Sequence, residues 1–276
     1  MPDTSPATWR PHLRIGAVSY LNSRPLIRFL PQTLPGASIE VDLPSRLADA
    51  LAAGRLDVAL IPSIEFFRNP GYTIVSDACI ASDGPVRSVK LYCRVPVAEI
   101  RTLALDEGSR TSAALTRIVL KERFSVEPRI ETLSIGASTD DSAADAIMLV
   151  GDRGMALPNG RFHTVWDLGE QWRTWTGLPF VFAMWVARAE VDPGELAEGL
   201  AAARDEGVRQ TDRIAWEESP RLGIPESDCR RYFRDNLRFV LGPNERKGLE
   251  AFHRLAARHG LVPEGGQLVF ADHLSR

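Results

Sequence analysis

Neutral hydrogen-bonding side chains gather at two points of the sequence where an apolar run stops. The stretch 19–26, Ser-Tyr-Leu-Asn-Ser-Arg-Pro-Leu, follows the apolar run 15–18, and the stretch 106–112, Asp-Glu-Gly-Ser-Arg-Thr-Ser, follows the run 103–105. Both patterns indicate a strand, a polar turn and the start of a helix. The first amides of a helix have no partner inside it, so both stretches suit an anionic ligand such as a carboxylate or a phosphate.

The second stretch is the richer in donors. Ser109, Thr111 and Ser112 can donate to one carboxylate together with the helix amides, and Arg110 adds positive charge. In the first stretch, Asn22 or Ser23 is expected to cap the new helix, and Pro25 suits its first turn. The alternative for both stretches is an ordinary capped connection between a strand and a helix, with no ligand.

The composition is typical of a globular protein with two domains. The chain has 276 residues, of which 44% are hydrophobic and 25% are charged, and its formal net charge is −3. This charge argues against a protein that coats nucleic acid or an anionic membrane surface. No segment has the ~20 apolar residues that a membrane span needs. Residues 1–11 resemble a disordered leader and not a signal peptide, and the three widely spaced cysteines are expected to be reduced, buried thiols in a cytoplasmic protein.

Alternating strands and helices are predicted, which indicates the α/β class. Strands are expected at 15–18, 38–42, 56–61, 73–76, 86–94, 103–105, 130–133, 146–150 and 180–188. Helices are expected at 26–30, at 45–54, from 63 onward, and at 113–124, 195–210, 226–236 and 244–259. Ser45 is expected to cap the second of these helices. The stretch 31–36 is expected to break the first helix before the strand at 38–42, and 217–220 is expected to be a polar segment.

Two long strands, 86–94 and 180–188, bracket the second half of the strand and helix pattern. A chain that crosses out on one strand and returns on the other forms two lobes joined by a two-strand hinge. Lobe 1 is then expected to contain 12–92 and 189–276, and lobe 2 is expected to contain 93–188.

The ordered set of motifs resembles one enzyme family. The motifs are Val-Ser-Tyr-Leu-Asn-Ser-Arg-Pro-Leu at 18–26, Gly-Arg-Leu-Asp-Val-Ala-Leu-Ile-Pro at 54–62, Gly-Pro-Val-Arg-Ser-Val at 84–89, the stretch 106–112, Gly-Asp at 151–152, Trp172, and Thr-Gly-Leu-Pro-Phe-Val-Phe-Ala-Met-Trp at 176–185. Together they resemble the chorismate dehydratases of the futalosine route to menaquinone. The resemblance implies a cytosolic enzyme with the fold of type II periplasmic binding proteins, and it covers the chain from about 13 to the last helices.

The same resemblance implies a lyase that removes water from chorismate to give 3-[(1-carboxyvinyl)oxy]benzoate, with no metal and no redox cofactor. It implies Asn22 and Ser88 as catalytic residues. It implies substrate-binding residues at Ser19, Tyr20, Gly84, Val86, Ser109, Arg110, Thr111, Ser112, Gly151, Asp152 and Phe180. Phe180 and Trp185 are expected to stack on the substrate ring or to fill the core, and Arg24 and Arg87 to contact substrate or to face solvent.

No motif identifies a protein base. Glu65, Asp83, Asp152, His163 and Glu170 have suitable side chains, and the enolpyruvyl carboxylate of the substrate is a further candidate. Two other functions stay open: the sister enzyme that acts on cyclic dehypoxanthine futalosine, and a non-catalytic protein of the same fold that binds small anions. The expected partner is the small molecule chorismate, without nucleic acid or membrane, and a homodimer is left open.

Overall fold

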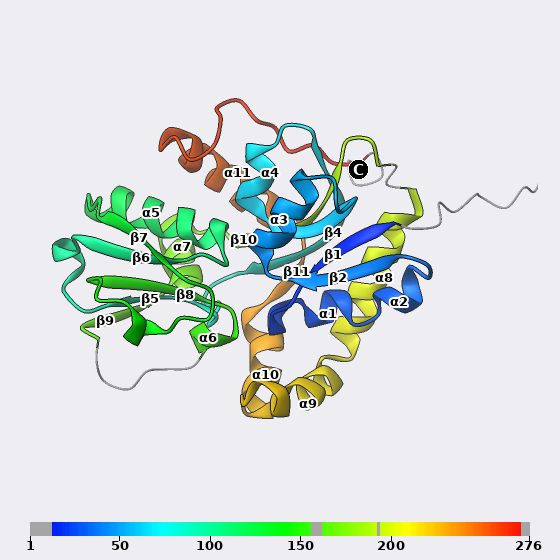
Figure 1. Cartoon of the computed structure of the whole chain (residues 1–276), viewed down its shortest axis with the longest axis horizontal. Coiled ribbons are helices and arrows are strands. Elements are labelled where there is room, and N and C mark those ends of the chain that lie inside the picture. The colour runs from blue at the N-terminus through cyan, green and yellow to red at the C-terminus, as the bar shows by residue number, and fades with distance from the viewer. Residues whose placement is uncertain (1–12, 156–161, 192–193, 272–276) are drawn as a thin grey trace, which may run out of the picture.

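Two β-sheets organise the chain into two α/β lobes that lie side by side (Figure 1). The computed structural model describes residues 13–155, 162–191 and 194–271, so the expected leader at 1–11 lies outside the described residues. The larger sheet has the strand order β11-β4-β10-β3-β1-β2, with β1 (Arg14–Val18), β2 (Ser38–Asp42), β3 (Val58–Pro62), β4 (Tyr72–Ser82), β10 (Phe180–Arg188) and β11 (Arg238–Val240). The smaller has the order β7-β6-β8-β5-β9, with β5 (Val89–Cys93), β6 (Thr102–Asp106), β7 (Arg129–Leu133), β8 (Ala146–Val150) and β9 (Thr164–Asp167). The predicted two-lobed α/β fold is confirmed.

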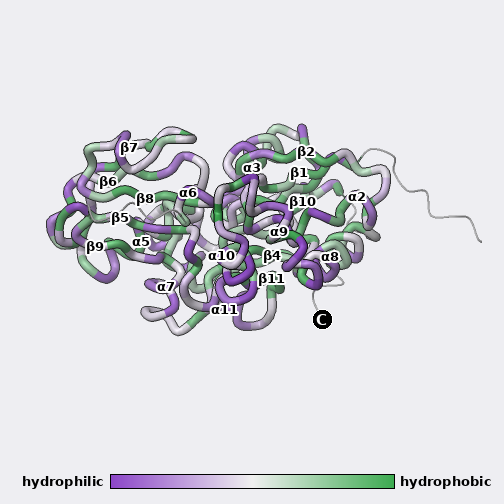
Figure 2. Tube along the Cα trace, turned by 90° about the horizontal axis from the view of Figure 1, so that it is seen from below, coloured by the Kyte–Doolittle hydropathy of each residue, from purple (hydrophilic) through white to green (hydrophobic). Residues whose placement is uncertain are grey.

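Each sheet mixes parallel and antiparallel pairs. In the larger sheet β1 runs parallel to β2 and β3, whereas β10 runs antiparallel to β3 and β4. In the smaller sheet β6 runs parallel to β7 and β8, whereas β5 runs antiparallel to β8 and β9. All residues of β3 and β8 are buried, as expected for parallel strands covered on both faces. Figure 2 shows apolar stretches along β1 and β8 within the lobes.

Helices cover both sheets and connect their strands. In chain order they are η1 (Leu21–Ser23), α1 (Arg24–Ile27), α2 (Leu30–Thr33), α3 (Pro44–Ala52), α4 (Ser63–Arg68), η2 (Val97–Glu99), α5 (Arg110–Phe124), η3 (Thr139–Asp141), α6 (Asp152–Met155), α7 (Leu168–Thr176), α8 (Gly194–Arg209), α9 (Thr211–Leu222), α10 (Glu226–Arg231), the π-helical turn η4 (Tyr232–Asn236) and α11 (Pro243–Arg258). Among the described residues, no helix is both long and apolar enough to span a membrane.

The chain passes between the sheets through two connections, 83–88 between β4 and β5 and 177–179 between α7 and β10. The strand expected at 180–188 is confirmed, but the strand expected at 86–94 is shorter because the backbone of Arg87 has a positive φ of 63° and leaves the extended conformation. The strands that follow the two connections, β5 and β10, belong to different sheets. If each lobe is defined by its sheet, the boundaries between the lobes lie in the connections 83–88 and 177–179, before the expected boundaries at 92/93 and 188/189.

Two predicted helix caps are wrong. Ser23 stands at the N-cap position of α1, but its side chain accepts no hydrogen bond from the helix. Its hydroxyl donates instead to the carbonyl oxygens of Val18 at 2.5 Å and Tyr20 at 2.8 Å, which closes the turn after β1. Ser45 lies inside α3, which begins one residue earlier at Pro44. Pro25 does lie in the first turn of α1, where its missing N–H costs nothing.

Other differences concern lengths and two added strands, β9 and β11. The strand expected at 73–76 extends over all of β4, and the polar segment 217–220 is part of α9. Pro31 lies in the first turn of α2 and does not break a helix. The short strands β9 and β11 were not expected. The three cysteines are buried and free, as predicted, and burial raises the thiol pKa of Cys93 to about 12 and of Cys229 to about 11.

Candidate active site

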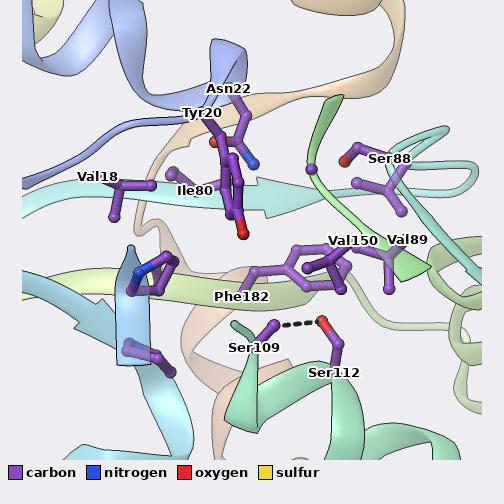
Figure 3. Close-up of a pocket in the computed structure, with 15 residues that line it drawn as sticks. Val18, Tyr20, Asn22, Ile80, Ser88, Val89, Ser109, Ser112, Val150 and Phe182 are labelled. Carbon is purple, nitrogen blue, oxygen red and sulfur yellow. Dashed lines mark hydrogen bonds between the residues drawn. The ribbon is translucent and has the colours of Figure 1, made fainter. Parts of the chain in front are cut away.

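A pocket lies between the lobes, at the carboxyl ends of β1, β3 and β8. Its free space is about 450 Å³, the part open to solvent included. Such crevices beyond the carboxyl ends of parallel strands are the common ligand sites of open α/β sheets. The lining residues are Val18, Tyr20, Asn22, Pro44, Pro62, Ile80, Val86, Ser88, Val89, Ser109, Ser112, Val150, Gly151, Phe182 and Ala183 (Figure 3).

The start of α5 forms one wall of the pocket. The hydroxyl of Ser109 donates to Oγ of Ser112 at 2.9 Å, and Figure 3 shows both side chains on this wall. Ser112 is buried, and both residues belong to the predicted anion-binding stretch. The free amides and the dipole of this helix favour a negative charge at its start. This wall therefore suits a carboxylate.

Asn22 approaches the pocket from the other lobe, on the single turn η1. Its side chain interacts with the hydroxyl of Tyr232, and its Oδ1 atom is buried with no hydrogen-bond partner among the described residues. An amide oxygen without a partner is costly in a buried place unless a ligand or a water satisfies it. Asn22 is thus free to accept a hydrogen bond from a bound molecule.

Ser88 enters the pocket at the end of the first connection between the lobes. Its N–H donates to the carbonyl oxygen of Val86 at 2.8 Å, across Arg87 with its positive φ of 63°. This is a γ-turn of the rare, strained kind, which costs of order 1–3 kcal/mol and persists only where its surroundings hold it. The turn gives the buried Ser88 side chain its direction.

Asp167, the residue that caps α7, holds this strained turn. Its Oδ1 accepts from the N–H of Val86 at 2.8 Å, and its Oδ2 accepts from the N–H of Arg87 at 2.6 Å. Gly169, in the first turn of α7, packs against the same connection, since a Cβ atom added to it would stand 2.5 Å from the carbonyl oxygen of Gly84. The connection is therefore pressed against the start of α7 and is well ordered by it.

Tyr20 bridges the pocket from lobe 1 to lobe 2. Its ring packs on Gly151, where an added Cβ would lie 2.7 Å from Cδ1, and its hydroxyl lies close to Gly108. Burial raises the pKa of Tyr20 to about 12, and the nearby carboxylate of Asp106 adds to the rise, while Arg153 opposes it. At neutral pH Tyr20 is therefore a protonated phenol.

Of the residues that the resemblance implied, the pocket brings together Tyr20, Asn22, Val86, Ser88, Ser109, Ser112 and Gly151. Thr111 lies on the opposite side of α5, where its hydroxyl accepts from the N–H of Ile64 at 3.2 Å. Arg110 forms ion pairs with Asp49 at 2.8 Å and Glu65 at 3.4 Å. Both residues join α5 to lobe 1 and do not line the pocket.

The remaining residues of the expected site also lie outside the lining. Asp152 accepts from the N–H of Leu21 at 3.1 Å, and its pKa is raised by burial against the lowering effects of this bond and of Arg24. Ser19 donates its N–H to Asp42 at 3.0 Å behind the turn. Gly84 is a buried turn residue with a positive φ of 125°.

Phe180 and Trp185 are core residues. Phe180 is 1% exposed and makes edge contacts with Trp172, Phe182 and Phe252, and Trp185 is fully buried. The aromatic ring that lines the pocket is Phe182. Phe182 lies within the motif 176–185, two residues after Phe180 on the same strand. Side chains two positions apart share one face of a strand, so this spacing was the signal in the sequence for Phe182.

Tyr232 is the polar residue at this site that was not expected from the sequence. It is 1% exposed, and its hydroxyl donates to Oγ of Ser88 at 2.7 Å. It begins the turn η4, in a segment that shows the ordinary pattern of a surface helix, so no local signal identified it. Arg24 pairs with Glu218 at 3.5 Å and Arg87 with Asp228 at 3.7 Å, both away from the lining.

The candidate bases lie elsewhere. Glu65 pairs with Arg68 at 2.6 Å, and Asp83 pairs with Arg173 at 2.9 Å. His163 bonds its neighbour Thr164 at 3.1 Å, and Glu170 is exposed on α7. Within the described part of the chain, no group of three or more His, Cys, Asp or Glu side chains is arranged to hold a metal ion.

The sequence matches a family model over most of its length and is similar to a curated relative. The model described as menaquinone biosynthesis matches residues 13–258. The chain is 32% identical over 262 residues to the chorismate dehydratase of Thermus thermophilus, covering 88% of this chain and 94% of the relative.

Similar solved structures share the fold at low identity. Protein AF1704 from Archaeoglobus fulgidus has a TM-score of 0.70 at 13% identity, covering 92% of this chain and 99% of that one. The alkanesulfonate-binding protein SsuA from Xanthomonas axonopodis pv. citri has a TM-score of 0.67 at 17% identity, covering 96% of this chain and 100% of that one. The expected likeness to the fold of periplasmic binding proteins is confirmed.

Proposed function

Because the chain belongs to the menaquinone biosynthesis family, we propose that it is a chorismate dehydratase, a hydro-lyase that converts chorismate to 3-[(1-carboxyvinyl)oxy]benzoate and water. The observation that carries this function is the pocket in which Asn22 and Ser88 lie opposite the start of α5. The proposal extends to the futalosine route and to a cytoplasmic enzyme, as the motif resemblance implies.

Chorismate carries two carboxylates, and the start of α5 suits one of them. The hydroxyl of Ser112, whose oxygen accepts from Ser109, and the free amides of the first turn offer several donors in one direction. The charged Arg110 is held by Asp49 and Glu65, so this wall binds an anion through neutral donors. The apolar lining by Val150 and Phe182 suits the ring.

Ser88 can donate a hydrogen bond to the leaving hydroxyl, and Oδ1 of Asn22, which has no partner among the described residues, can accept from that hydroxyl and orient it. The reaction removes the proton at C3, spreads the charge toward the ring carboxylate, breaks the bond from C4 to its hydroxyl, and forms an aromatic ring. Hydroxide is a poor leaving group, so donors that bind it more tightly as it departs lower the barrier. The reaction changes no net oxidation state, so atoms and electrons balance without a redox partner.

The base in this proposal is the enolpyruvyl carboxylate of chorismate itself. The five titratable residues considered from the sequence are not among the lining residues, and the polar side chains of the lining are neutral hydroxyls, phenols and an amide. Rotation about the ether bond brings the substrate carboxylate near the C3 proton, and a site that fixes this rotamer supplies a base through proximity.

The test is purified protein with chorismate, followed by chromatography and mass spectrometry. We expect a product lighter than chorismate by one water, formed about 10²-fold more slowly by the matched variant Ser88→Ala. Chorismate that binds without losing water contradicts the proposal and indicates a binding protein. Turnover of cyclic dehypoxanthine futalosine in place of chorismate indicates the sister enzyme.

A further inference from the structure

Two residues expected to act on the substrate meet at one buried phenol. The hydroxyl of Tyr232 donates to Oγ of Ser88 at 2.7 Å, and the side chain of Asn22 interacts with the same hydroxyl. Ser88 comes from the connection between the lobes, Asn22 from η1, and Tyr232 from the C-terminal helices. One phenol therefore joins three separate parts of the chain beside the pocket.

The segment that carries Tyr232 grips the connection 83–88 at two further points. Nδ2 of Asn236, at the end of η4, donates to the carbonyl oxygen of Pro85 at 2.8 Å, and Asp228 on α10 pairs with Arg87 at 3.7 Å. Figure 1 shows α10 below and between the two lobes. A π-helical turn such as η4 is rare and occurs often at functional sites. The helices after the second lobe therefore brace the connection that holds Ser88.

We infer that Tyr232 is a positioning residue that fixes the hydroxyl of Ser88 as a donor into the pocket. A serine hydroxyl has one proton and two acceptor sites, and a rotating hydroxyl can point in several directions. Because Tyr232 occupies one acceptor site of Ser88, the proton of Ser88 is left to point elsewhere, toward a bound molecule. The identity of that bound molecule as chorismate rests on the proposed function.

The electrostatics of the phenol support this role. Burial raises the pKa of Tyr232 well above its usual value, against the lowering effects of Ser88 and Asn22. Tyr232 therefore keeps its proton across the working pH range and stays a donor. Since Tyr232 is not among the lining residues, it acts through Ser88 and not on the substrate.

The experiment compares Tyr232→Phe with the matched variant Tyr72→Phe. Tyr72 lies on β4 away from the pocket lining, is 8% exposed, and has a buried hydroxyl without a hydrogen-bond partner among the described residues. We expect Tyr232→Phe to lower kcat about tenfold with little change in KM, because the leaving-group donor is disordered while the carboxylate wall is intact. Tyr72→Phe is expected to leave both constants unchanged.

A double-mutant cycle separates positioning from packing. If Tyr232 acts through Ser88, adding Tyr232→Phe to Ser88→Ala changes kcat by less than twofold. A further tenfold loss in that background, or equal kinetics for Tyr232→Phe and the wild type, overturns the inference. A fall in melting temperature that accounts for the lost activity, with kcat per folded molecule unchanged, also overturns it.

A second readout does not depend on turnover. The chain has four tyrosines, so a ring labelled with ¹³C at Cζ gives few NMR signals, and the Tyr232 signal is the one that Tyr232→Phe removes. It should move in Ser88→Ala, and a signal that does not move overturns the inference. A wild type that fails to dehydrate chorismate contradicts the proposed function alone. The inference then depends on this signal, which reports the hydrogen bond to Ser88 without turnover.

Discussion

Tyr232 and Ser88 share a hydrogen bond of 2.7 Å although 144 positions separate them in the chain. The bond joins the C-terminal helices to the connection between the lobes, next to the strained turn at Arg87. Asp167 holds the same turn from the other side through two backbone N–H groups. The direction of the Ser88 side chain is thus set by Asp167 at the start of α7 and by Tyr232 from the C-terminal helices.

We expect replacement of Asn22 or Ser88 by alanine to act mainly on the chemical step. Each variant removes a short, neutral hydrogen-bonding group from the lining without adding charge. If the bond to the departing hydroxyl is made fully only in the transition state, kcat falls about 10²-fold and KM changes little. Steady-state kinetics with chorismate measure this, alongside thermal unfolding. A loss of stability in proportion to the loss of activity would assign both residues a structural role.

Thr111 and Ser112 are neighbours on α5 with different expected roles. Ser112 lines the pocket, so Ser112→Ala should raise the dissociation constant for chorismate and leave stability nearly unchanged. The hydroxyl of Thr111 accepts from the buried N–H of Ile64, so Thr111→Val should lower the free energy of unfolding by about 1–3 kcal/mol, because that N–H loses its partner. Calorimetric titration and denaturant unfolding of both variants check this. If Ser112→Ala instead lowers stability and leaves the dissociation constant for chorismate unchanged, the start of α5 is an ordinary helix start without a ligand.

Gly151 is expected to be essential for the shape of the pocket. Its φ is +67°, and an added Cβ would meet the Tyr20 ring at 2.7 Å. Gly136, with a φ of +88° and no atom within 4 Å of its added Cβ, is the matched control. Alanine at either position strains the backbone by of order 1–3 kcal/mol, but Gly151→Ala alone should push Tyr20 into the pocket. We expect a KM at least about tenfold higher for Gly151→Ala than for Gly136→Ala. Equal KM values would show that Tyr20 adapts without cost.

The ion pair at the start of β1 should make stability depend on acidity. Hydrogen bonds from Arg14, at 2.6 Å and 3.0 Å, lower the pKa of Asp57 from its usual 3.8. A carboxyl with a lowered folded pKa adds stability above its unfolded pKa and loses it as the pH falls through the folded value. Urea unfolding from about pH 6 to about pH 3 should therefore show a steeper fall for the wild type than for Asp57→Asn.

Asp106 supplies the control of opposite sign. Burial raises its pKa, so the folded state holds its proton more readily than the unfolded chain does. Its ionisation opposes folding, and the penalty disappears as the pH falls below the folded pKa. Asp106→Asn should therefore steepen the loss of stability on acidification, whereas Asp57→Asn reduces it. Identical pH profiles for the two variants would contradict both assignments.

Local patterns predicted most elements because they depend on neighbours in the chain. The strands at 38–42, 146–150 and 180–188 agree with β2, β8 and β10, since the first alternates polar and apolar residues and the other two carry apolar runs. The caps at Ser23 and Ser45 failed because a serine hydroxyl bonds whichever backbone group the tertiary fold presents, and Ser23 meets the carbonyl oxygens of Val18 and Tyr20. The strand at 86–94 failed because a turn held by the distant Asp167 overrides its alternating pattern.

The candidate site divides in the same way. Motifs at strand ends identified Asn22, Ser109 and Ser112, because the ends of parallel strands meet at one edge of a sheet. Phe180 was named and Phe182 was not, because alternation along a strand places residues two positions apart on one face and does not reveal which of them reaches the pocket. Tyr232 could not be found, since its role arises from the packing of the last helices against the connection between the lobes.

The last prediction concerns the base. Glu65 pairs with Arg68, Asp83 pairs with Arg173, and Asp152 accepts from the N–H of Leu21. Each of these contacts stabilises the charged carboxylate and so opposes its protonation by the substrate. His163 and Glu170 lie on the surface of the second lobe. We therefore expect amide variants of the four acids, and His163→Gln, each to keep kcat within about tenfold of the wild type, well short of the 10²–10⁴-fold that a lost general base costs.

The complementary arm changes the substrate. Chorismate blocked as an ester at the enolpyruvyl carboxylate keeps the ring, the leaving hydroxyl and the ring carboxylate, and it loses the group assigned as base. We expect the ester to bind at the start of α5 and to lose water more slowly by at least about 10²-fold. We propose that the start of α5 holds the ring carboxylate, so chorismate esterified only at that carboxylate should instead bind weakly. A single protein variant that abolishes turnover with binding preserved, or an enolpyruvyl ester that loses water at the normal rate, rules out the substrate carboxylate as the base.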